Sequence, residues 1–412
     1  MPGTGQEAQF IQRAAKVVGP LRRALIELLS QSGAPAPGSH TRLAVRRLHP
    51  SQRSRLLRAL GTEDDLSTLY HLPGMDGLRR ILREASSGRP DPALLRRCEA
   101  CIDDYEHFLD AEEVGRDRLH AVIGGFIPEA RDAVIRTNSQ AAFNAMSNLM
   151  GHYAEVQVLC MLVSPGPVQD RCNLAMVRGF AGWRRLRNDP ATLFHGYGGG
   201  SGAVAADLRV TDLDGNGLQD ATGPALLEPF CSHPLPRLTL HSRYDLGSQY
   251  HLAGNTVGAE SVCTFYVGEL LWNAELRVPA AEQTFCLESA VVSTPCKYLL
   301  FDVLLHESIW PGTEPTVESY RVVPHGPVTE RNSSWRQFDR IDLGVKRRAH
   351  APGLTAIDSI QTQNYGKLVE YALARLGLPR HGMRGFRCEM AYPVYGTQVA
   401  MRFDLPQTPA SG

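Results

Sequence analysis

Residues 40–60, "HTRLAVRRLHPSQRSRLLRAL", have side chains that could contact nucleic acid. They carry six arginines, and no carboxylate occurs between Glu27 and Glu63. An arginine guanidinium can fork onto the acceptor edge of guanine, a glutamine amide can pair with adenine, and any cation can neutralise a phosphate. A solvated helix face normally mixes charges of both signs. The stretch therefore indicates a duplex DNA contact, with the solvated side of two ordinary helices as the alternative.

Two short helices, 41–48 and 51–60, would position these donors. The turn between them contains His49 and Pro50, where a turn glycine is usual, and Ser51 is a candidate cap. The leucines at 56, 57 and 60 would face inward, as in a recognition helix, and the donors outward. We expect Arg53 and Arg55 nearest the bases. The predicted DNA-binding residues are Arg46, Arg47, Gln52, Arg53, Arg55 and Arg58.

Three stretches together resemble uncharacterised bacterial proteins described as helix-turn-helix transcriptional regulators. They are "RRALIELLSQSG", "LYHLPGMDGLRRILREA" and "TNSQAAFNAMSNLMGHYAEV", and the resemblance covers about residues 10–190. It implies a DNA-binding amino-terminal region. It implies nothing about the carboxyl-terminal half.

Two further motifs suggest metal sites but favour plainer interpretations. Cys98 and Cys101 have CxxC spacing, yet no second CxxC exists, so buried thiols are favoured over zinc or a redox pair. The segment 212–220, "DLDGNGLQD", resembles the start of a calcium loop, but its twelfth position is Gly223 where a glutamate belongs. A hairpin turn explains it better. The sequence thus predicts no metal site and no cofactor.

Catalytic motifs are missing from the sequence. It contains no GxSxG, HExxH, Walker or GxGxxG motif. Asp302 and His306 would share one face of a strand, but no nucleophile accompanies them. A second cationic cluster at 181–190, "AGWRRLRNDP", is expected to cover apolar surface rather than contact bases. The sequence therefore favours a protein without catalysis, although a site assembled only in three dimensions would escape this reasoning.

Composition limits the possible partners. The chain has 412 residues, and 43 basic residues balance 43 acidic ones, so attraction to nucleic acid must be local. No run of eighteen apolar residues and no export signal is present, and nine scattered cysteines are typical of thiols in a reducing compartment. We expect a cytoplasmic protein of bacterial type with no membrane partner.

The apolar pattern changes from helical spacing to short alternating runs along the chain. We therefore expect an α+β protein. Its domains would be a helical, helix-turn-helix-like domain at 1–190, a glycine-rich linker or loop at 191–203, and a β-rich domain at 204–412 with one long helix near 355–376. The helices are expected at 10–31, 41–48, 51–60, 74–86, 91–109, 129–151 and 154–163.

These features favour a DNA-binding transcriptional regulator whose β-rich domain senses a small-molecule effector or mediates assembly into homo-oligomers. Two alternatives stay open. One is an enzyme with its site on the β-rich half, which would need convergent polar groups in a deep pocket. The other is a structural or assembly protein without catalysis.

Overall fold

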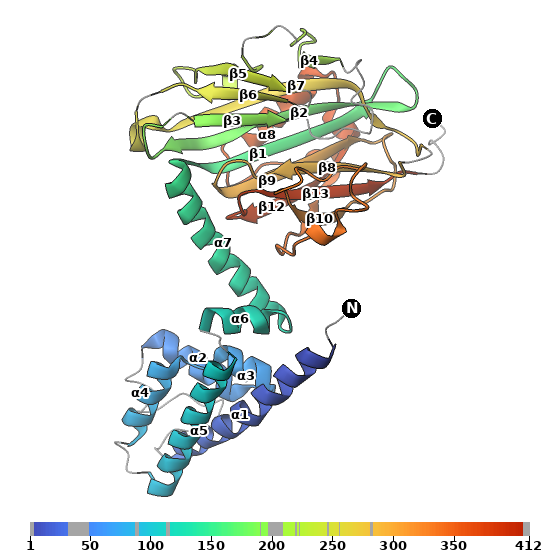
Figure 1. Cartoon of the computed structure of the whole chain (residues 1–412). Helices are drawn as coiled ribbons and strands as arrows, with labels where there is room; N and C mark the ends of the chain where they lie inside the picture. The colour runs from blue at the N-terminus through green and yellow to red at the C-terminus, as the bar shows by residue number, and fades with distance from the viewer. Residues whose placement is uncertain are drawn as a thin grey trace. The chain divides into compact units, whose positions relative to one another are not determined.

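The structure is a computed structural model that combines helices and sheets (Figure 1). The chain divides into two compact units, Met1–Ile135 and Arg136–Gly412, with helices in the first and all the strands of the described residues in the second. The fold is therefore mixed α+β, as predicted. The residues that the structure describes are 4–31, 49–86, 90–112, 116–189, 191–196, 209–218, 221, 223–244, 247–254, 256–280 and 283–406.

Helices that bury one apolar face each build the first unit. Their bounds are α1 Thr4–Gln31, α2 Pro50–Gly61, α3 Asp65–His71, α4 Met75–Ser86, α5 Pro92–Ala111, α6 Arg116–Gly124 and α7 Pro128–Met150, which continues into the second unit. Leu21 and Leu25 of α1 pack with Leu56 of α2 and Tyr105 of α5 in the core. The helices predicted at 10–31, 51–60, 74–86, 91–109 and 129–151 are confirmed to within a few residues, apart from an earlier start of α1. The helix predicted at 41–48 lies outside the described residues.

Strands dominate the second unit, and those in the described ranges form three sheets. The largest has the order β11-β12-β9-β1-β2-β7-β4, and the two smaller ones are β10-β13-β8 and β3-β6-β5. The bounds are β1 His152–Pro165, β2 Arg171–Arg185, β3 Ala191–Gly196, β4 Val210–Asp212, β5 Leu238–Tyr244, β6 Gly247–Leu252, β7 Cys263–Leu276, β8 Phe285–Val291, β9 Cys296–His306, β10 Thr316–Arg321, β11 Arg347–Ala349, β12 Met383–Ala391 and β13 Thr397–Asp404.

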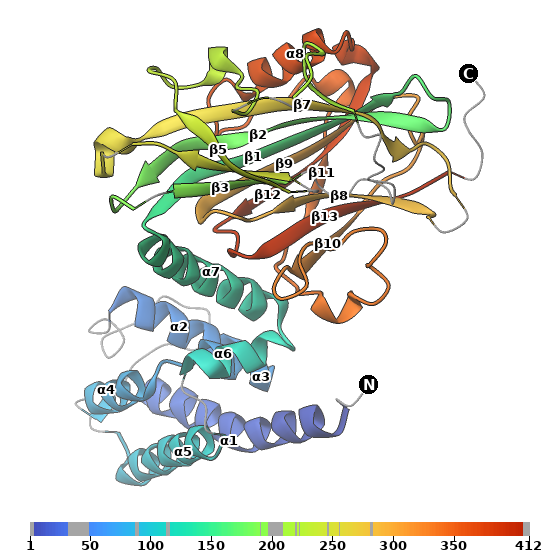
Figure 2. The ribbon, with the colours of Figure 1, turned by 45° about the horizontal axis from the view of Figure 1, so that its top comes forward.

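The second unit has three layers (Figure 2). Helix α8, Tyr365–Arg375, packs on one face of the seven-stranded sheet through Leu368, Val369 and Leu373. Side chains from both smaller sheets pack on the other face, among them Leu193 and Met401. The sheet is therefore apolar on both sides.

Among the described helices of the chain, none has the length and apolar character that crossing a membrane requires.

The segment 154–163 is a strand, so the predicted helix there is wrong. It forms most of β1, which pairs antiparallel with β2 and parallel with β9 at the middle of the large sheet. Leu159 and Met161 face the smaller sheets, while Val158 and Cys160 face α8. A strand buried on both faces shows no alternation of apolar and polar residues, so periodicity alone does not separate it from a buried helix.

The long helix predicted near 355–376 is shorter in the structure. Helix α8 begins only after Asn364, whose φ of 58° is left-handed, and Ile360, which the predicted helix included, is 98% exposed. Asp358, within the predicted helix, lies outside α8 and accepts a hydrogen bond from the Gly366 amide at 2.9 Å. The predicted end is confirmed, because Gly377 adopts a φ of 66° there.

The strand predictions succeeded where apolar runs were bounded by turn residues. Strands β5, β6, β7, β9, β10 and β13 fall on the short alternating runs from which strands were expected in the carboxyl-terminal half. Strand β2, in the part expected to be helical, and strands β8, β11 and β12 were missed. The predicted linker at 191–203 begins with β3, and the rest of it lies outside the described residues.

A fully buried ionic network links α8 to the large sheet. The Asp302 carboxylate on β9 accepts hydrogen bonds from Arg387 Nε at 2.8 Å and Nη2 at 2.7 Å and from the Tyr365 hydroxyl at 2.7 Å, and it lies 3.2 Å from His350 Nε2. Burial alone would raise the pKa of Asp302, but hydrogen bonds from Arg387 and His350 outweigh burial and hold that pKa below its usual value. Asp302 is therefore ionised and paired, and His306, its expected neighbour, is not part of this network.

We predict that Asp302→Asn destabilises the second unit by about 3–5 kcal/mol, because the buried Arg387 charge loses its partner. Urea unfolding of the full chain measures this free energy. The matched control is Asp189→Asn, which breaks an exposed pair with Arg187 and should change the free energy of unfolding by less than about 1 kcal/mol. Equal effects of the two substitutions would contradict the prediction.

Candidate functional site

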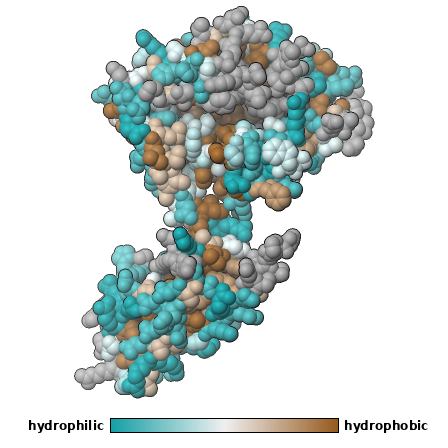
Figure 3. Space-filling model, in the orientation of Figure 1, coloured by the Kyte–Doolittle hydropathy of each residue, from teal (hydrophilic) through white to brown (hydrophobic). Residues whose placement is uncertain are grey.

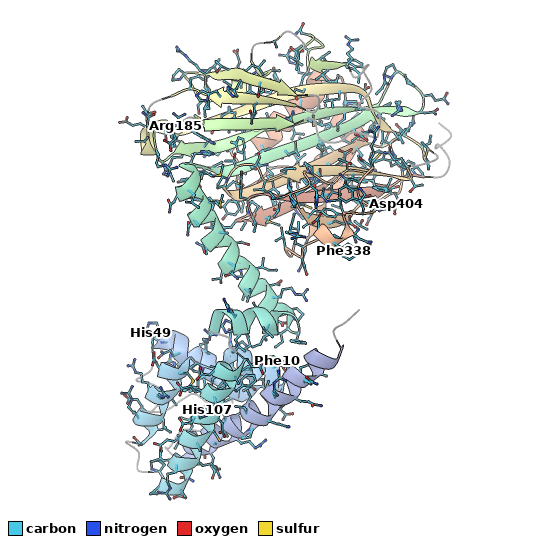
Figure 4. All side chains as sticks on the ribbon, in the orientation of Figure 1. Phe10, His49, His107, Arg185, Phe338 and Asp404 are labelled. Carbon is cyan, nitrogen blue, oxygen red and sulfur yellow. The ribbon has the colours of Figure 1, made fainter. Side chains whose placement is uncertain are left out.

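The predicted DNA-contact helix exists as α2, with a different amino-terminal end. The helix begins at Pro50, with His49 in the cap position, so Ser51 lies inside the helix rather than at its cap (Figure 4). Leu56 and Leu60 are buried as predicted, whereas Leu57 is 43% exposed. The first helix of the expected helix-turn-helix pair falls outside the described residues, so the pair itself stays a prediction.

The predicted donors on α2 differ in how far they reach solvent. Arg58 is exposed, and Gln52, Arg53 and Arg55 are half-buried. Arg55 Nη2 donates to the Tyr70 carbonyl oxygen at 3.2 Å and lies 3.4 Å from His120 Nε2, so this guanidinium binds within its own unit. Arg46 and Arg47 lie outside the described residues.

Arg58 lines a small polar cavity of about 450 Å³ together with Tyr70, His71 and Glu129. Burial, followed by the charges of Arg58 and Arg55, lowers the pKa of His71. The cationic helix therefore has a carboxylate beside it in the folded structure, that of Glu129, although no carboxylate occurs near it in the sequence before Glu63. The visible face of this unit is mostly hydrophilic (Figure 3).

The second cationic cluster holds strands and loops together. Arg185, at the end of β2 (Figure 4), is 4% exposed and donates to the Leu252 carbonyl at 2.8 Å and to the Gly254 carbonyl. Arg187 donates to the Leu149 carbonyl at 2.6 Å, and Trp183 is 1% exposed. Arg185 and Arg187 thus bind backbone carbonyls within their own unit, and the expectation that the cluster makes no base contact stays a prediction.

The two metal-like motifs have structural roles. Cys98 is fully buried on α5, and its thiol donates to the Ala24 carbonyl oxygen at 3.3 Å, as a packed thiol does. The Asp212 carboxylate accepts from the amides of Asp214 at 2.9 Å and Asn216 at 2.8 Å, which closes the predicted turn. No cluster of three metal-ligating side chains occurs within the described ranges.

The feature best suited to binding is a cavity of about 530 Å³ in the second unit, between the large sheet and the elements that cover its face. Its walls are mainly apolar, with side chains from β1, β2, β3 and β7: Leu159, Met161, Met176, Phe180, Leu193 and Phe265. Gly179 on β2 also lines it, and no side chain fits at this position, because a Cβ would come within 2.0 Å of the Phe265 carbonyl oxygen. This volume is within the range of small-molecule sites.

Polar groups in the cavity wall come from strands β1 and β2 and from the segment between β10 and β11. Arg178 on β2 pairs with Glu269 on β7 at 2.7 Å, where the carboxylate side chain is 1% exposed. His325 lies 3.6 Å from Asp339. Gln157 on β1 donates from Nε2 to the Val291 carbonyl oxygen of β8 at 2.7 Å, which joins two sheets.

Sequence reasoning missed this cavity, although a signal was present. Gln157 interrupts the apolar run "VQVLCMLV", and Arg178 interrupts "LAMVRGF". A polar side chain within a strand buried on both faces must find a partner or line a cavity. The helical interpretation of 154–163 hid the first of these, because on a helix the glutamine could have faced solvent.

Comparison of the chain with protein-family models, with curated proteins and with solved structures finds no match. Function is therefore argued from the chemistry of the cavity and of α2 alone.

We predict slow alkylation of Cys98 in the folded chain. Burial, followed by the neighbouring Cys101, raises the pKa of the Cys98 thiol to about 11, so the reactive thiolate is scarce at pH 7–8. Mass spectrometry after timed iodoacetamide treatment should show that Cys98 reacts only near pH 11 or after unfolding in urea. The half-buried Cys101 should react first. Rapid labelling of Cys98 at pH 7, or stoichiometric zinc lost in Cys98→Ser, would contradict the packed-thiol assignment.

Proposed function

We propose that the chain is a regulator whose β-rich unit binds a small, mainly apolar molecule and whose helical unit contacts duplex DNA. The cavity of about 530 Å³ is the observation that carries the ligand-binding part. An apolar concave site with a few fixed polar groups is the usual form of a small-molecule site. Burial of apolar ligand surface would supply affinity, and the polar groups would supply specificity.

Binding is better supported than catalysis at this cavity. His325 is the one imidazole among the described lining residues, and Asp339, which it approaches, also accepts a hydrogen bond from Arg336. The described lining includes no cysteine, and the hydroxyl of Ser289 on β8 accepts a hydrogen bond from Gln398 at 2.8 Å. An acyl-transfer site would instead pair such a hydroxyl with a base. The contacts of the described wall therefore favour a binding site.

The DNA-binding part rests on the exposed Arg58 and half-buried Arg53 of α2, together with the acid-free sequence around them. Phosphate contacts supply most of the salt-dependent affinity, so even a few exposed cations on one helix contribute. Arg55 would contribute less than the sequence indicated, since it already donates to Tyr70.

Assembly is the alternative that a specific surface favours. Val323 is 71% exposed, Trp335 56% and Phe338 85%, all between β10 and β11 of the second unit (Figure 4, Phe338). Exposed apolar side chains that lie close in sequence are common at protein interfaces. Sedimentation velocity across a concentration series would reveal such self-association.

We predict that N-phenyl-1-naphthylamine, an uncharged fluorescent probe, binds the full chain with enhanced emission. Val291→Phe should weaken this binding by about tenfold or more, because the larger side chain fills the cavity. Val323→Phe makes the same change at an exposed position and should leave affinity unaltered. Absence of binding to the unsubstituted chain, or equal affinities of the two variants, would overturn the proposed ligand site.

For DNA, we predict that Arg53→Ala and Arg58→Ala each reduce the slope of log affinity against log salt by about one where the arginine contacts a phosphate. A substitution that removes a base contact should instead cost about 1–3 kcal/mol at one base pair. Fluorescence anisotropy of the full chain with random and selected duplexes distinguishes these results. Arg83→Ala on α4 removes the same charge from another exposed position and is the control. No binding at low salt, or binding unaffected by the α2 substitutions, would favour the solvated-face alternative.

A further inference from the structure

One polar side chain of the cavity wall, Gln157, has an atom without a hydrogen-bond partner. Gln157 is 8% exposed, and its Oε1 is buried without any hydrogen-bond donor among the described residues. The other end of the same amide is occupied, because Nε2 donates to the Val291 carbonyl at 2.7 Å. Since a carbonyl accepts only from a donor, this contact fixes which end of the amide is nitrogen and leaves Oε1 as the open acceptor.

The position of Gln157 makes this acceptor a preorganised group. Its backbone is held in the middle of the large sheet, opposite Phe180 on one side and Leu299 on the other. Its side chain is held by β8 of another sheet. A side chain fixed at both ends loses little freedom when a ligand arrives, so the hydrogen bond it offers is well directed.

Charge in the cavity wall is already compensated. The basic side chains among the described lining residues are Arg178 and His325, and they lie beside Glu269 and Asp339 respectively. An ionised ligand would have to give up its hydration without meeting an unpaired opposite charge, which is unfavourable in an apolar cavity. The wall therefore suits an uncharged molecule.

From these observations we infer that the cavity selects uncharged apolar ligands that carry a hydrogen-bond donor, an alcohol hydroxyl or an amide N–H, directed at Oε1 of Gln157. This inference rests on the proposed ligand-binding function and narrows its ligand class. A site built to hydrogen-bond a ligand group discriminates against the analogue that lacks the group, because the buried acceptor is then left unpaired.

The test compares 5-nonanol with 5-nonanone, which share one carbon skeleton and are both achiral. Only the alcohol has a donor. Each is titrated against the full chain carrying N-phenyl-1-naphthylamine, and displacement gives the two affinities. We expect the alcohol to bind about three- to tenfold more tightly, the range that one net hydrogen bond supplies.

Gln157→Met keeps the length of the side chain and removes the acceptor, so it should bring the ratio of the two affinities to about one. The ratio compares two ligands on the same variant, so a general loss of stability from freeing the Val291 carbonyl largely cancels. Gln363→Met makes the same chemical change at an exposed position of the same unit and should preserve the preference.

The outcomes separate this inference from the proposed function. If the naphthylamine binds but the alcohol and the ketone compete equally, or neither competes, the donor preference is wrong and the ligand cavity stands. A preference that survives in Gln157→Met would also overturn the inference, because another group would then supply it. If the naphthylamine itself does not bind, the proposed ligand-binding function is wrong, and the donor preference that rests on it is wrong as well.

Discussion

Burial of the large sheet on both faces is the constraint on which the second unit depends. Strand β1 lies between β2 and β9, with α8 on one side and the smaller sheets on the other. The two ladders satisfy its backbone polar groups, and every side chain in its middle must be apolar or find a partner. The stability of the sheet thus comes from area removed from water on two sides, as in layered α/β structures.

Two buried polar side chains of that sheet, Asp302 and Gln157, meet the need for hydrogen-bond partners to different extents. Asp302 on β9 has all its neighbours within the protein, since Arg387, Tyr365 and His350 surround one carboxylate. Gln157 on β1, which lines the cavity, has a partner for its nitrogen only, and its buried oxygen has none among the described residues. A buried carboxylate whose two oxygens are both paired rigidifies a core, whereas a half-paired amide in a cavity wall is what a ligand can complete. The contrast separates the structural polar cluster from the candidate site.

The sequence allowed prediction of those parts of the fold whose pattern is local. Amphipathic helices such as α5 and strands bounded by turns such as β13 were predicted, because the hydrophobic period and the turn residues that indicate them lie within a few residues of one another. Strand β1 was not, since two-sided burial erases alternation. Nor was the cavity, because Gln157 and Val291 are 134 residues apart and come together only through sheet packing. The Asp302 network was not predicted for the same reason, because Asp302 and Arg387 are 85 residues apart in the sequence.

The same distinction between local pattern and assembled contact applies to α2. Its charge was readable from sequence, but whether each cation is available depends on what lies beside it. Arg55 donates to a carbonyl of α3, and Arg58 shares a small cavity with Glu129, so the positive surface of α2 is smaller than its three arginines indicate. With a net charge of zero overall, DNA affinity would depend on these few exposed groups and on their salt-sensitive phosphate contacts. An effector in the cavity could alter that affinity only by binding two states of the chain differently. Ligand binding, which requires one preformed cavity, therefore rests on fewer conditions than ligand-controlled DNA binding.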